Sequence, residues 1–276
     1  MGLRQLGGTD GGWLIEPAPL DTTRFGLDVA RLTVTRGPAD PQSLIEALHQ
    51  HPSQVLIGRY PAELTWVAAA LQASGRDVLP VGGLIYWESP AGAVERVNSG
   101  PAGVDVVEAH EAANEPAGSA VAHLVDALVL DTFAGYGTHY RYNPLFDPAA
   151  IVAGYAEWAR GCLRAPGCGV LVLRVDGEPV GLATLGPDGP DVDILLAGVR
   201  PSHQGRGLYS SLLRGAQEWA AARGSERVVI STQTHNVRVQ RAWAREGWRP
   251  VDTFETVHLI QPGLLDQATP TDRTTL

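Results

Sequence analysis

Residues 193–224, DILLAGVRPSHQGRGLYSSLLRGAQEWAAARG, contain the pattern that decides the fold of this chain. The apolar run 194–199 predicts a buried strand, and the residues from 208 onward predict a helix that ends at Gly224. One face of that helix is apolar and consists of Leu208, Leu212, Leu213, Ala216, Trp219 and Ala220. Residues 204–207 form a glycine-containing turn between the strand and the helix. Unpaired amides and the positive helix end predict an anion site there, which a diphosphate would fill.

Two common phosphate-binding motifs do not fit this turn. It is not a P-loop, because no Gly-Lys-Ser/Thr follows and the chain contains no lysine. A G-x-G-x-x-G fingerprint fails at Ser210, which stands where the third glycine belongs. The order of strand, Val-x-Pro, Gln-x-x-Gly-x-Gly and a helix with a Leu-Leu pair instead resembles the acetyl-CoA motif of the Gcn5-related N-acetyltransferase (GNAT) superfamily. Tyr209 departs from this motif, because the position is usually small.

Length and composition limit the class of protein. The 276 residues are 44% hydrophobic, which is enough for a substantial core in one or two domains. No apolar run is long enough to cross a membrane, and the first residues lack a signal-peptide pattern. We therefore expect a cytoplasmic protein without a membrane partner. Two cysteines are too few for a disulfide framework or a zinc site, so no metal is expected.

Charge is unevenly distributed along the chain. The net charge of −9 argues against a nucleic-acid partner, yet residues 201–250 carry eight arginines against three glutamates. This cationic segment surrounds the predicted phosphate turn and would suit coenzyme A, which carries phosphates at two places. An arginine-rich helix surface without a ligand is the alternative.

The order of the predicted elements indicates an α/β (α+β) protein. For residues 104–262 the resemblance implies a GNAT fold, with a mixed central sheet that splays open between flanking helices. Residues 13–90 predict a smaller N-terminal αβ domain, which could be a degenerate partial GNAT unit, with a turn at 21–26. Residues 91–103 are rich in Pro, Gly and Ser and predict a linker. Two final strands are predicted at 249–254 and 255–260, and the polar tail 263–276 is expected to be disordered.

The resemblance implies where coenzyme A would bind. In this superfamily the pantetheine arm lies between two splayed strands, here 194–199 and 227–232. The backbone of Ala197, Gly198 and Val199 is expected to hold the arm, with Gly198 allowing a close approach. The diphosphate would bind the turn, formed by Gln204, Gly205, Arg206, Gly207, Leu208 and Tyr209. The expected ligand is acetyl-CoA or another short acyl-CoA.

Asp193 is the candidate general base. Acetyl transfer to an amine requires removal of a proton from the amine and a proton for the leaving thiolate. Asp193 stands eleven residues before Gln204, the offset at which histone acetyltransferases of the superfamily carry their base glutamate. A solvated strand-end aspartate is the alternative, and Asp191 is a second candidate.

The usual general acid is missing. Asn236 stands where members of the superfamily often bond the pantetheine, although capping the next helix would also explain it. Seven residues later many members have a tyrosine acid, but this chain has Trp243, whose indole N–H is not acidic at neutral pH. Asn236 and Trp243 are both expected to contact the cofactor. Nearby donors in the sequence are His235, Tyr209 and His203, and the first two are retained as candidate catalytic residues.

Residues 133–144 hold an aromatic cluster between the first two helices of the expected GNAT unit. It predicts an acceptor wall formed by Tyr136, His139, Tyr140, Arg141 and Tyr142. The tyrosines could stack on a sugar or a base, and Arg141 could bind a phosphate or carboxylate. An ordinary loop packed by its own aromatics is the alternative. His258, in a final strand, is expected to be a core or edge histidine.

A second resemblance concerns the acceptor. The segments TQTHNVRVQRAWAREGW (232–248) and LDTTRFGLDVARL (20–32), together with the preceding αβ unit, are similar to the dTDP-fucosamine acetyltransferase family over about residues 13–260. This similarity implies an acceptor such as a nucleotide-linked amino sugar, gripped between the two domains. The missing tyrosine is a departure from that family as well.

These features predict an acetyl-CoA-dependent N-acyltransferase that acts on a small-molecule amine, as a monomer or homodimer. An amino sugar or a specialised metabolite is the expected acceptor. A protein or peptide N-acetyltransferase is the alternative within the same class. A non-catalytic acyl-CoA-binding module is the alternative from another class, and Trp243 favours it.

Overall fold

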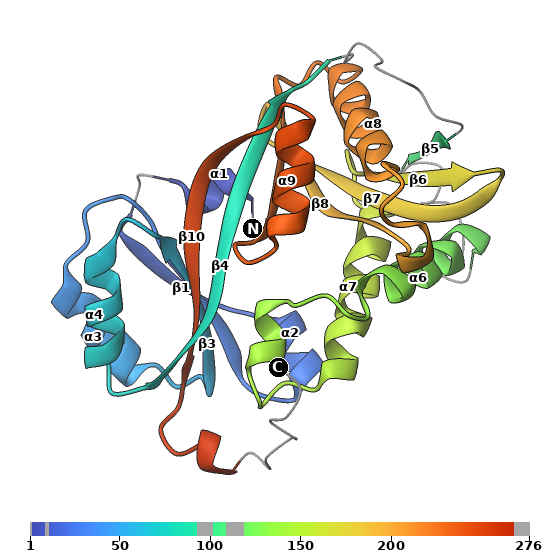
Figure 1. The fold of residues 1–276 in the computed structure, drawn as a ribbon. Helices are drawn as coiled ribbons and strands as arrows, with labels where there is room; N and C mark the ends of the chain where they lie inside the picture. Colours follow the sequence, from blue (N-terminus) through green and yellow to red (C-terminus); the bar gives the residue numbers. More distant parts are fainter. Residues whose placement is uncertain (1, 9–10, 93–101, 109–118, 268–276) are drawn as a thin grey trace.

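The computed structural model describes residues 2–8, 11–92, 102–108 and 119–267. These residues form a ten-stranded sheet in the order β1-β2-β3-β10-β4-β9-β8-β7-β6-β5, with helices on both faces (Figure 1). Parallel and antiparallel neighbours both occur in it. The predicted α/β class with a mixed sheet and flanking helices is therefore confirmed.

The first part of the chain supplies one end of the sheet. Its elements are α1 (Leu3–Leu6), β1 (Trp13–Pro17), α2 (Pro19–Phe25), β2 (Val29–Val34), α3 (Pro41–Gln50), β3 (Val55–Pro61), α4 (Thr65–Ala73) and β4 (Asp77–Pro90). Asp40 caps α3, because its carboxylate accepts from the amides of Gln42 and Ser43, and Pro41 fits the first helical position. Buried side chains of α3 and α4 pack on the sheet and form one core cluster.

The second part supplies the other end and the helices that cover it. Its elements are β5 (Ala102–Glu108), α6 (Ala120–Phe133), α7 (Pro148–Cys162), β6 (Gly169–Val175), β7 (Glu178–Asp188), β8 (Asp191–Val199), α8 (Tyr209–Ala221), β9 (Arg227–Gln233), α9 (Val237–Arg245) and β10 (Arg249–Ile260). Short 3₁₀ turns occupy His139–Tyr142, Pro201–His203 and Leu265–Gln267. The predicted apolar face of α8 is buried, except for the partly buried Leu208.

Alternation along β6 explains why helices cover both faces. Leu171 and Leu173 belong to the core beneath α8, whereas Val170 and Val172 belong to the core beneath α6 and α7. Successive side chains of a strand point to opposite faces, so a continuous apolar run requires cover on both sides. The run GVLVLRV meets that requirement.

Two long strands interleave the two parts. β10, from the end of the chain, lies between β3 and β4, and β4 lies between β10 and β9. β10 belongs to the second part of the chain but pairs with two strands of the first, and β4 belongs to the first part but pairs with two strands of the second (Figure 1). The two expected units share one sheet, and the boundaries of the division into 13–90, 91–103 and 104–262 stay a prediction.

Two predicted elements were wrong. The expected turn at 21–26 is the end of helix α2, which begins at Pro19 and is closed by Gly26 in the left-handed region. The two expected final strands are one strand of twelve residues, since both edges of β10 are paired. Most of the expected linker and the tail beyond 267 lie outside the described residues.

Candidate active site

The centre of the sheet opens where β8 and β9 separate. These parallel strands are paired only as far as Ile194 opposite Ile230, although β8 continues to Val199 and β9 to Gln233. The pairing of β8 with β7 shifts register at the same place, between Ile194 and Leu196. Such an irregularity bends a strand and increases its twist. Beyond Ile194 the described chain shows no ladder between β8 and β9, so an extended ligand can enter the gap. The expected splayed sheet is confirmed.

Two glycines shape the turn after β8. Gly205 has a φ of 79° and Gly207 a φ of 74°, in the left-handed region that side chains disfavour. A Cβ at either position would meet nothing within 4 Å, so a side chain would fit there. These glycines are therefore required by the backbone conformation and not by lack of space. Within the described chain, no backbone carbonyl accepts from the amides of residues 205–208. These donors precede the thirteen-residue helix α8 and fit a diphosphate.

The side chains of the turn do not all face the same way. Gln204 donates from Nε2 to the carbonyl of Val199 at 2.9 Å and ties the turn to the end of β8. Arg206 is exposed, and its Nη2 lies 3.4 Å from the carbonyl oxygen of Ser202. Gln204 therefore shapes the turn, while Arg206 contributes its amide to it.

Gly198 is required by a neighbouring helix. A Cβ at Gly198 would lie 2.2 Å from Cγ2 of Thr132 in α6. The sequence predicted that Gly198 allows a close approach to the β8 backbone, and the group that approaches in the structure is this threonine. The hydroxyl of Thr132 is buried without a hydrogen-bond partner, and the residue lines the cavity described below.

Two aspartates at the start of β8 lie in different environments. Asp193 is 6% exposed, and burial raises the pKa of its carboxyl to about 7, with a further contribution from the charge of Asp188. Asp191 forms ion pairs with Arg227 at 2.7 Å and Arg4 at 3.3 Å. Burial acts to raise the pKa of Asp191, but these arginines hold it below its ordinary value. Asp193 can therefore exchange a proton near neutral pH, whereas Asp191 is held as an ion-pair anchor.

Trp243 and Tyr209 form a buried pair. Trp243 is 1% exposed, and its Nε1 donates to Oη of Tyr209 at 3.3 Å. Because that oxygen accepts the indole hydrogen, the hydroxyl hydrogen of Tyr209 must point elsewhere. Burial raises the pKa of Tyr209, and the indole hydrogen bond acts in the opposite direction. The unusual tyrosine of the turn thus contacts the tryptophan that stands in the usual tyrosine position.

Asn236 does not cap its helix through its side chain. It occupies the N-cap position of α9, but no side-chain capping hydrogen bond forms there. Its Nδ2 instead donates to Oγ1 of Thr232 at 2.9 Å, and Oη of Tyr136 lies 3.1 Å from the same oxygen. The capping explanation was therefore wrong. These three side chains stand at the end of β9, beside the gap.

One cavity of about 1570 Å³ connects these features. The predicted site residues that line it are Tyr136, His139, Tyr140, Asp193, Ala197, Gly198, Val199, Gln204, Gly205, Gly207, Leu208, Tyr209, Asn236 and Trp243. This volume exceeds that of a typical pocket for one drug-sized ligand, so it has room for a long cofactor and a second substrate.

Four predicted side chains lie outside this cavity. They are Arg141, Tyr142, Arg206 and His235, and all four are exposed. The rings of Tyr142 and His235 meet edge to face at 6.2 Å, and Arg141 bonds to the carbonyl of Ala134. The predicted catalytic role of His235 and the predicted binding roles of the other three side chains have no support from this geometry.

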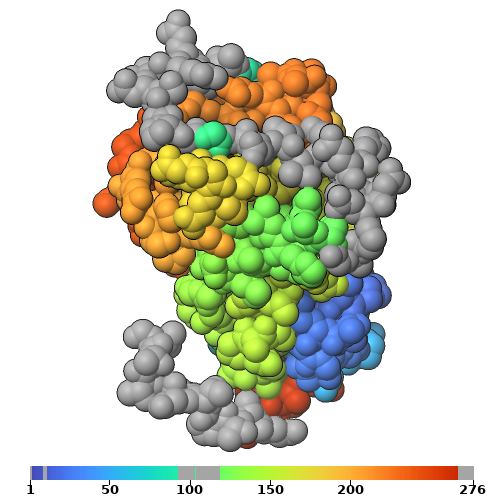
Figure 2. Space-filling model, turned by 90° about the vertical axis from the view of Figure 1, so that its right-hand side faces the viewer, coloured from blue at the N-terminus to red at the C-terminus, as the bar shows by residue number. Residues whose placement is uncertain are grey.

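The N-terminal part of the chain contributes cavity residues that were not predicted. Asp21, Arg24, Arg31 and Arg59 come from α2, β2 and β3. Figure 2 shows the blue N-terminal residues packed against the segment that contains α7, and Arg24 forms an ion pair with Glu157 of that helix at 3.0 Å. A signal was present in the sequence, because these charged residues interrupt otherwise apolar elements such as VLIGRYP.

Two histidines meet beneath this part of the cavity. His139 and His258 are buried, with 2.9 Å between Nδ1 of His139 and Nε2 of His258. Burial and the charge of Arg59 lower the pKa of both side chains, that of His258 to about 3. The prediction that His258 is a core histidine is confirmed, and both rings are neutral at physiological pH.

Comparison with known proteins points to one family. Residues 123–248 match the model of the acetyltransferase (GNAT) family. This part of the chain is similar to a GNAT acetyltransferase domain. A GCN5-related N-acetyltransferase from Sphaerobacter thermophilus has a similar fold, with 15% identity, a TM-score of 0.58, and 92% of this chain and 78% of that chain covered. A GCN5-related N-acetyltransferase from Kribbella flavida is similar at 18% identity and a TM-score of 0.55, covering 87% of this chain and 84% of that one.

Two further relatives have more specific names. A tandem GNAT protein from the clavulanic acid biosynthesis pathway has 15% identity and a TM-score of 0.53, with 90% of this chain and 77% of that chain covered. The spore coat polysaccharide biosynthesis protein SpsD of Bacillus subtilis is 28% identical over 137 residues, which are 49% of this chain and 46% of that protein. The match thus spans about half the length of this curated relative. In the described part of the chain, no helix is long and apolar enough to cross a membrane.

Proposed function

We propose that this chain is an acetyl-CoA-dependent N-acyltransferase that acts on the amine of a small molecule. The observation that carries the proposal is one cavity that joins the open gap between β8 and β9, the free amides of residues 205–208, and the buried carboxyl of Asp193. A long thioester ligand needs the first two features, and amine acylation needs the third.

The chain can hold acetyl-CoA, which supplies the activated acetyl group. The turn amides and the positive end of α8 would bind the diphosphate. Backbone groups of 195–199 would pair with the pantetheine in the gap, and Asn236 and Thr232 line the opposite side. Another short acyl-CoA would use the same contacts.

Asp193 would remove the proton that the amine loses as its nitrogen attacks the thioester carbonyl. A carboxyl with an ordinary pKa is a weak base near neutral pH, and burial makes Asp193 more basic. Tyr209 would supply the proton for the departing thiolate, because its hydroxyl hydrogen is not used in the bond to Trp243. Donation from the indole also stabilises the phenolate that develops, so Trp243 assists the acid that replaces the usual tyrosine.

A small acceptor is favoured by the residues that line the cavity. Side chains of α2, β2 and β3 line it together with those of the second part of the chain, so both parts supply walls of the acceptor end. Such a site can contact a small molecule from two sides. The polysaccharide-related name of SpsD supports an amino sugar, and the similarity to the dTDP-fucosamine acetyltransferase family supports a nucleotide-linked one. The name of the clavulanic acid pathway protein supports the wider alternative of a specialised metabolite.

Calorimetric titration with acetyl-CoA tests the first step. Gly205→Val should weaken binding at least tenfold, because a β-branched residue cannot hold the left-handed conformation without strain. Gly224→Val is the matched control, since Gly224 has a φ of 71° at the end of α8 and does not line the cavity. Wild-type protein that does not bind acetyl-CoA would overturn the proposed function.

A non-catalytic acyl-CoA-binding module is the second candidate, favoured by Trp243 in the place of the usual acid. Amine-dependent thiol release, measured on a panel of amino sugars and other small amines, separates the two. An enzyme turns over at least one amine and slows sharply in Asp193→Asn. Tight acetyl-CoA binding with no turnover of any amine would favour the binding module.

A further inference from the structure

Arg59 lies in the wall of the cavity and has no counter-charge among the residues that the structure describes. It stands in β3 and is surrounded by protein, although its side chain remains partly accessible from the cavity. Its Nε is buried and has no hydrogen-bond partner, and no carboxylate of the described chain forms an ion pair with it. Charges of this kind are costly inside a protein unless they are paired.

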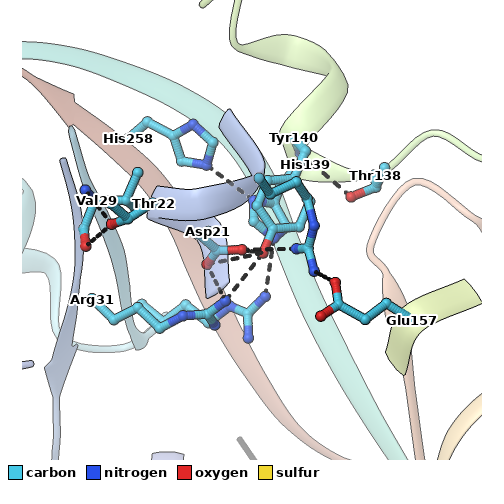
Figure 3. Close-up of polar contacts among 11 residues, drawn as sticks. Asp21, Thr22, Val29, Arg31, Thr138, His139, Tyr140, Glu157 and His258 are labelled. Atoms are coloured by element: carbon cyan, nitrogen blue, oxygen red, sulfur yellow. Dashed lines mark hydrogen bonds and ion pairs between the residues drawn. The ribbon is translucent and has the colours of Figure 1, made fainter. Parts of the chain in front are cut away.

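The neighbouring arginines already have partners. Arg31 donates to Asp21 at 2.5 Å and to Oη of Tyr140 at 3.1 Å (Figure 3). Arg24 donates to Asp21 at 3.0 Å. Arg24 also pairs with Glu157 at 3.0 Å. The acidic side chains of this cluster are therefore committed to Arg24 and Arg31, and Arg59 adds an unbalanced positive charge beside them.

The hydrogen atoms of the histidine pair can be assigned from one fixed amide. Oδ1 of Asn143 accepts from the amide of Leu145 at 3.0 Å, so its Nδ2 is the atom that donates to Nδ1 of His258 at 2.9 Å. The neutral His258 then carries its hydrogen on Nε2 and donates it to Nδ1 of His139. His139 is also neutral, so its own hydrogen is on Nε2.

This assignment leaves two donors facing one another. Nη2 of Arg59 lies 3.3 Å from Nε2 of His139, and each of these nitrogen atoms carries hydrogen. They cannot satisfy each other, and both residues line the cavity. Two converging donors with one net positive charge are matched by an oxygen atom that carries negative charge.

We propose that Arg59 and His139 form a binding site for an anionic group, a carboxylate or phosphate, of the acceptor amine. The inference rests on the proposed function and narrows the substrate class to amines that carry an acidic group. Tyr86, which also lines the cavity, lies within electrostatic range of both Arg59 and Asp193. In the proposed complex the acceptor presents its acid to Arg59 and directs its amine toward Asp193, since both residues line the same cavity.

The stability of the ligand-free protein gives the first test. Arg59→Met removes the unpaired cation, so we expect its Tm to rise by about 3 °C or more. Arg174→Met is the matched control, because Arg174 is a strand arginine that does not line the cavity and its removal should not stabilise the protein. A fall in Tm for Arg59→Met would mean that Arg59 is a structural residue and would overturn the inference.

Anion binding gives the second test, and it needs no acceptor. In the presence of saturating CoA, which fills the phosphate turn, inorganic phosphate or succinate should raise the Tm of the wild type and of Arg174→Met. Arg59→Met should lose this response, whereas Arg59→Lys should keep part of it. The probe with the larger shift identifies phosphate or carboxylate as the preferred group. An equal response in Arg59→Met and the wild type would contradict the proposed site.

Turnover gives the third test. Glucosamine 6-phosphate is compared with glucosamine, and glycine with glycinamide, by thiol release. The acidic member of at least one pair should have the higher kcat/KM in the wild type, by tenfold or more, and Arg59→Lys should reduce that ratio. Acetyl-CoA binding with no response to either anion sinks this inference alone, whereas failure to bind acetyl-CoA sinks the proposed function.

Discussion

The two ends of the cavity recognise ligands by different means. At the end formed by β8, β9 and the turn after β8, backbone groups dominate: amides of residues 205–208 and the unpaired edge of β8, shaped by Gly205 and Gly207. At the N-terminal end, side chains dominate: two arginines bind one aspartate, and a third arginine contacts a pair of neutral histidines. Backbone recognition suits a ligand common to a whole family, whereas side-chain recognition can change with the acceptor while the fold is retained.

The interleaved sheet holds the two ends of the cavity in a fixed relative position. β10, from the second part, pairs with β3 and β4 of the first, and β4 pairs with β9, so strand β3 with Arg59 is fixed relative to the gap between β8 and β9. A site assembled from both ends of the chain needs such rigidity, because catalytic groups must be held close to their productive geometry. The following predictions separate the contributions of the two ends.

Asp193→Asn should have the largest effect. Loss of the base is expected to lower kcat by about 10²–10⁴-fold, with acetyl-CoA affinity unchanged. In the wild type kcat/KM should fall below about pH 7, the pKa to which burial raises Asp193, because the protonated carboxyl cannot accept a proton. The pH profile of the residual activity of the variant should lack this fall. An unchanged profile would mean that a group other than Asp193 accepts the proton of the amine.

Tyr209→Phe should lower kcat about 10²-fold and leave the binding of acetyl-CoA nearly intact. Burial raises the pKa of Tyr209, so the wild-type hydroxyl keeps its proton throughout the neutral range. The double variant Tyr209→Phe/Trp243→Tyr offers a rescue, because it returns a hydroxyl to the usual position of the superfamily. Recovery of activity in the double variant would show that the acid has moved between these two contacting side chains. Full activity in Tyr209→Phe alone would show that the thiolate leaves without it.

Stability should depend on pH through the same carboxyl. The folded-state pKa of Asp193, about 7, lies above the ordinary value of a free aspartate, so the folded protein binds the proton more tightly. This contribution is complete below about pH 4 and is lost as the pH rises to 7. Asp193→Asn should therefore be more stable than the wild type at pH 8, by a few kcal/mol at most, with the difference vanishing near pH 4. Urea unfolding at the two pH values measures it, and buried His139 and His258 affect both proteins equally.

The sequence predicted one end of the cavity much better than the other. Strand, turn and apolar helix are contiguous in 193–224, so local spacing was sufficient for the turn, for Asp193 and for the β8 backbone. The pairing of Tyr209 with Trp243 joins residues 34 positions apart, and the contact of Arg59 with His139 joins residues 80 positions apart. No local period predicts such contacts. The pairing of β10 with β3 and β4 is also non-local. These distant partners keep residues 249–260 in one strand, which is why the prediction of two strands was wrong.

Gln204→Ala should have the smallest effect. The Gln204 side chain donates to the carbonyl of Val199 at 2.9 Å and so holds the turn against the end of β8, but it is not the source of the amides that would bind the diphosphate. Loss of one such hydrogen bond is worth about 1 kcal/mol. We therefore expect acetyl-CoA affinity to fall about fivefold by calorimetry, with the preference among amine acceptors unchanged. A loss as large as that of Gly205→Val would mean that the glutamine contacts the cofactor directly, whereas a changed acceptor preference would show that the two ends of the cavity are coupled.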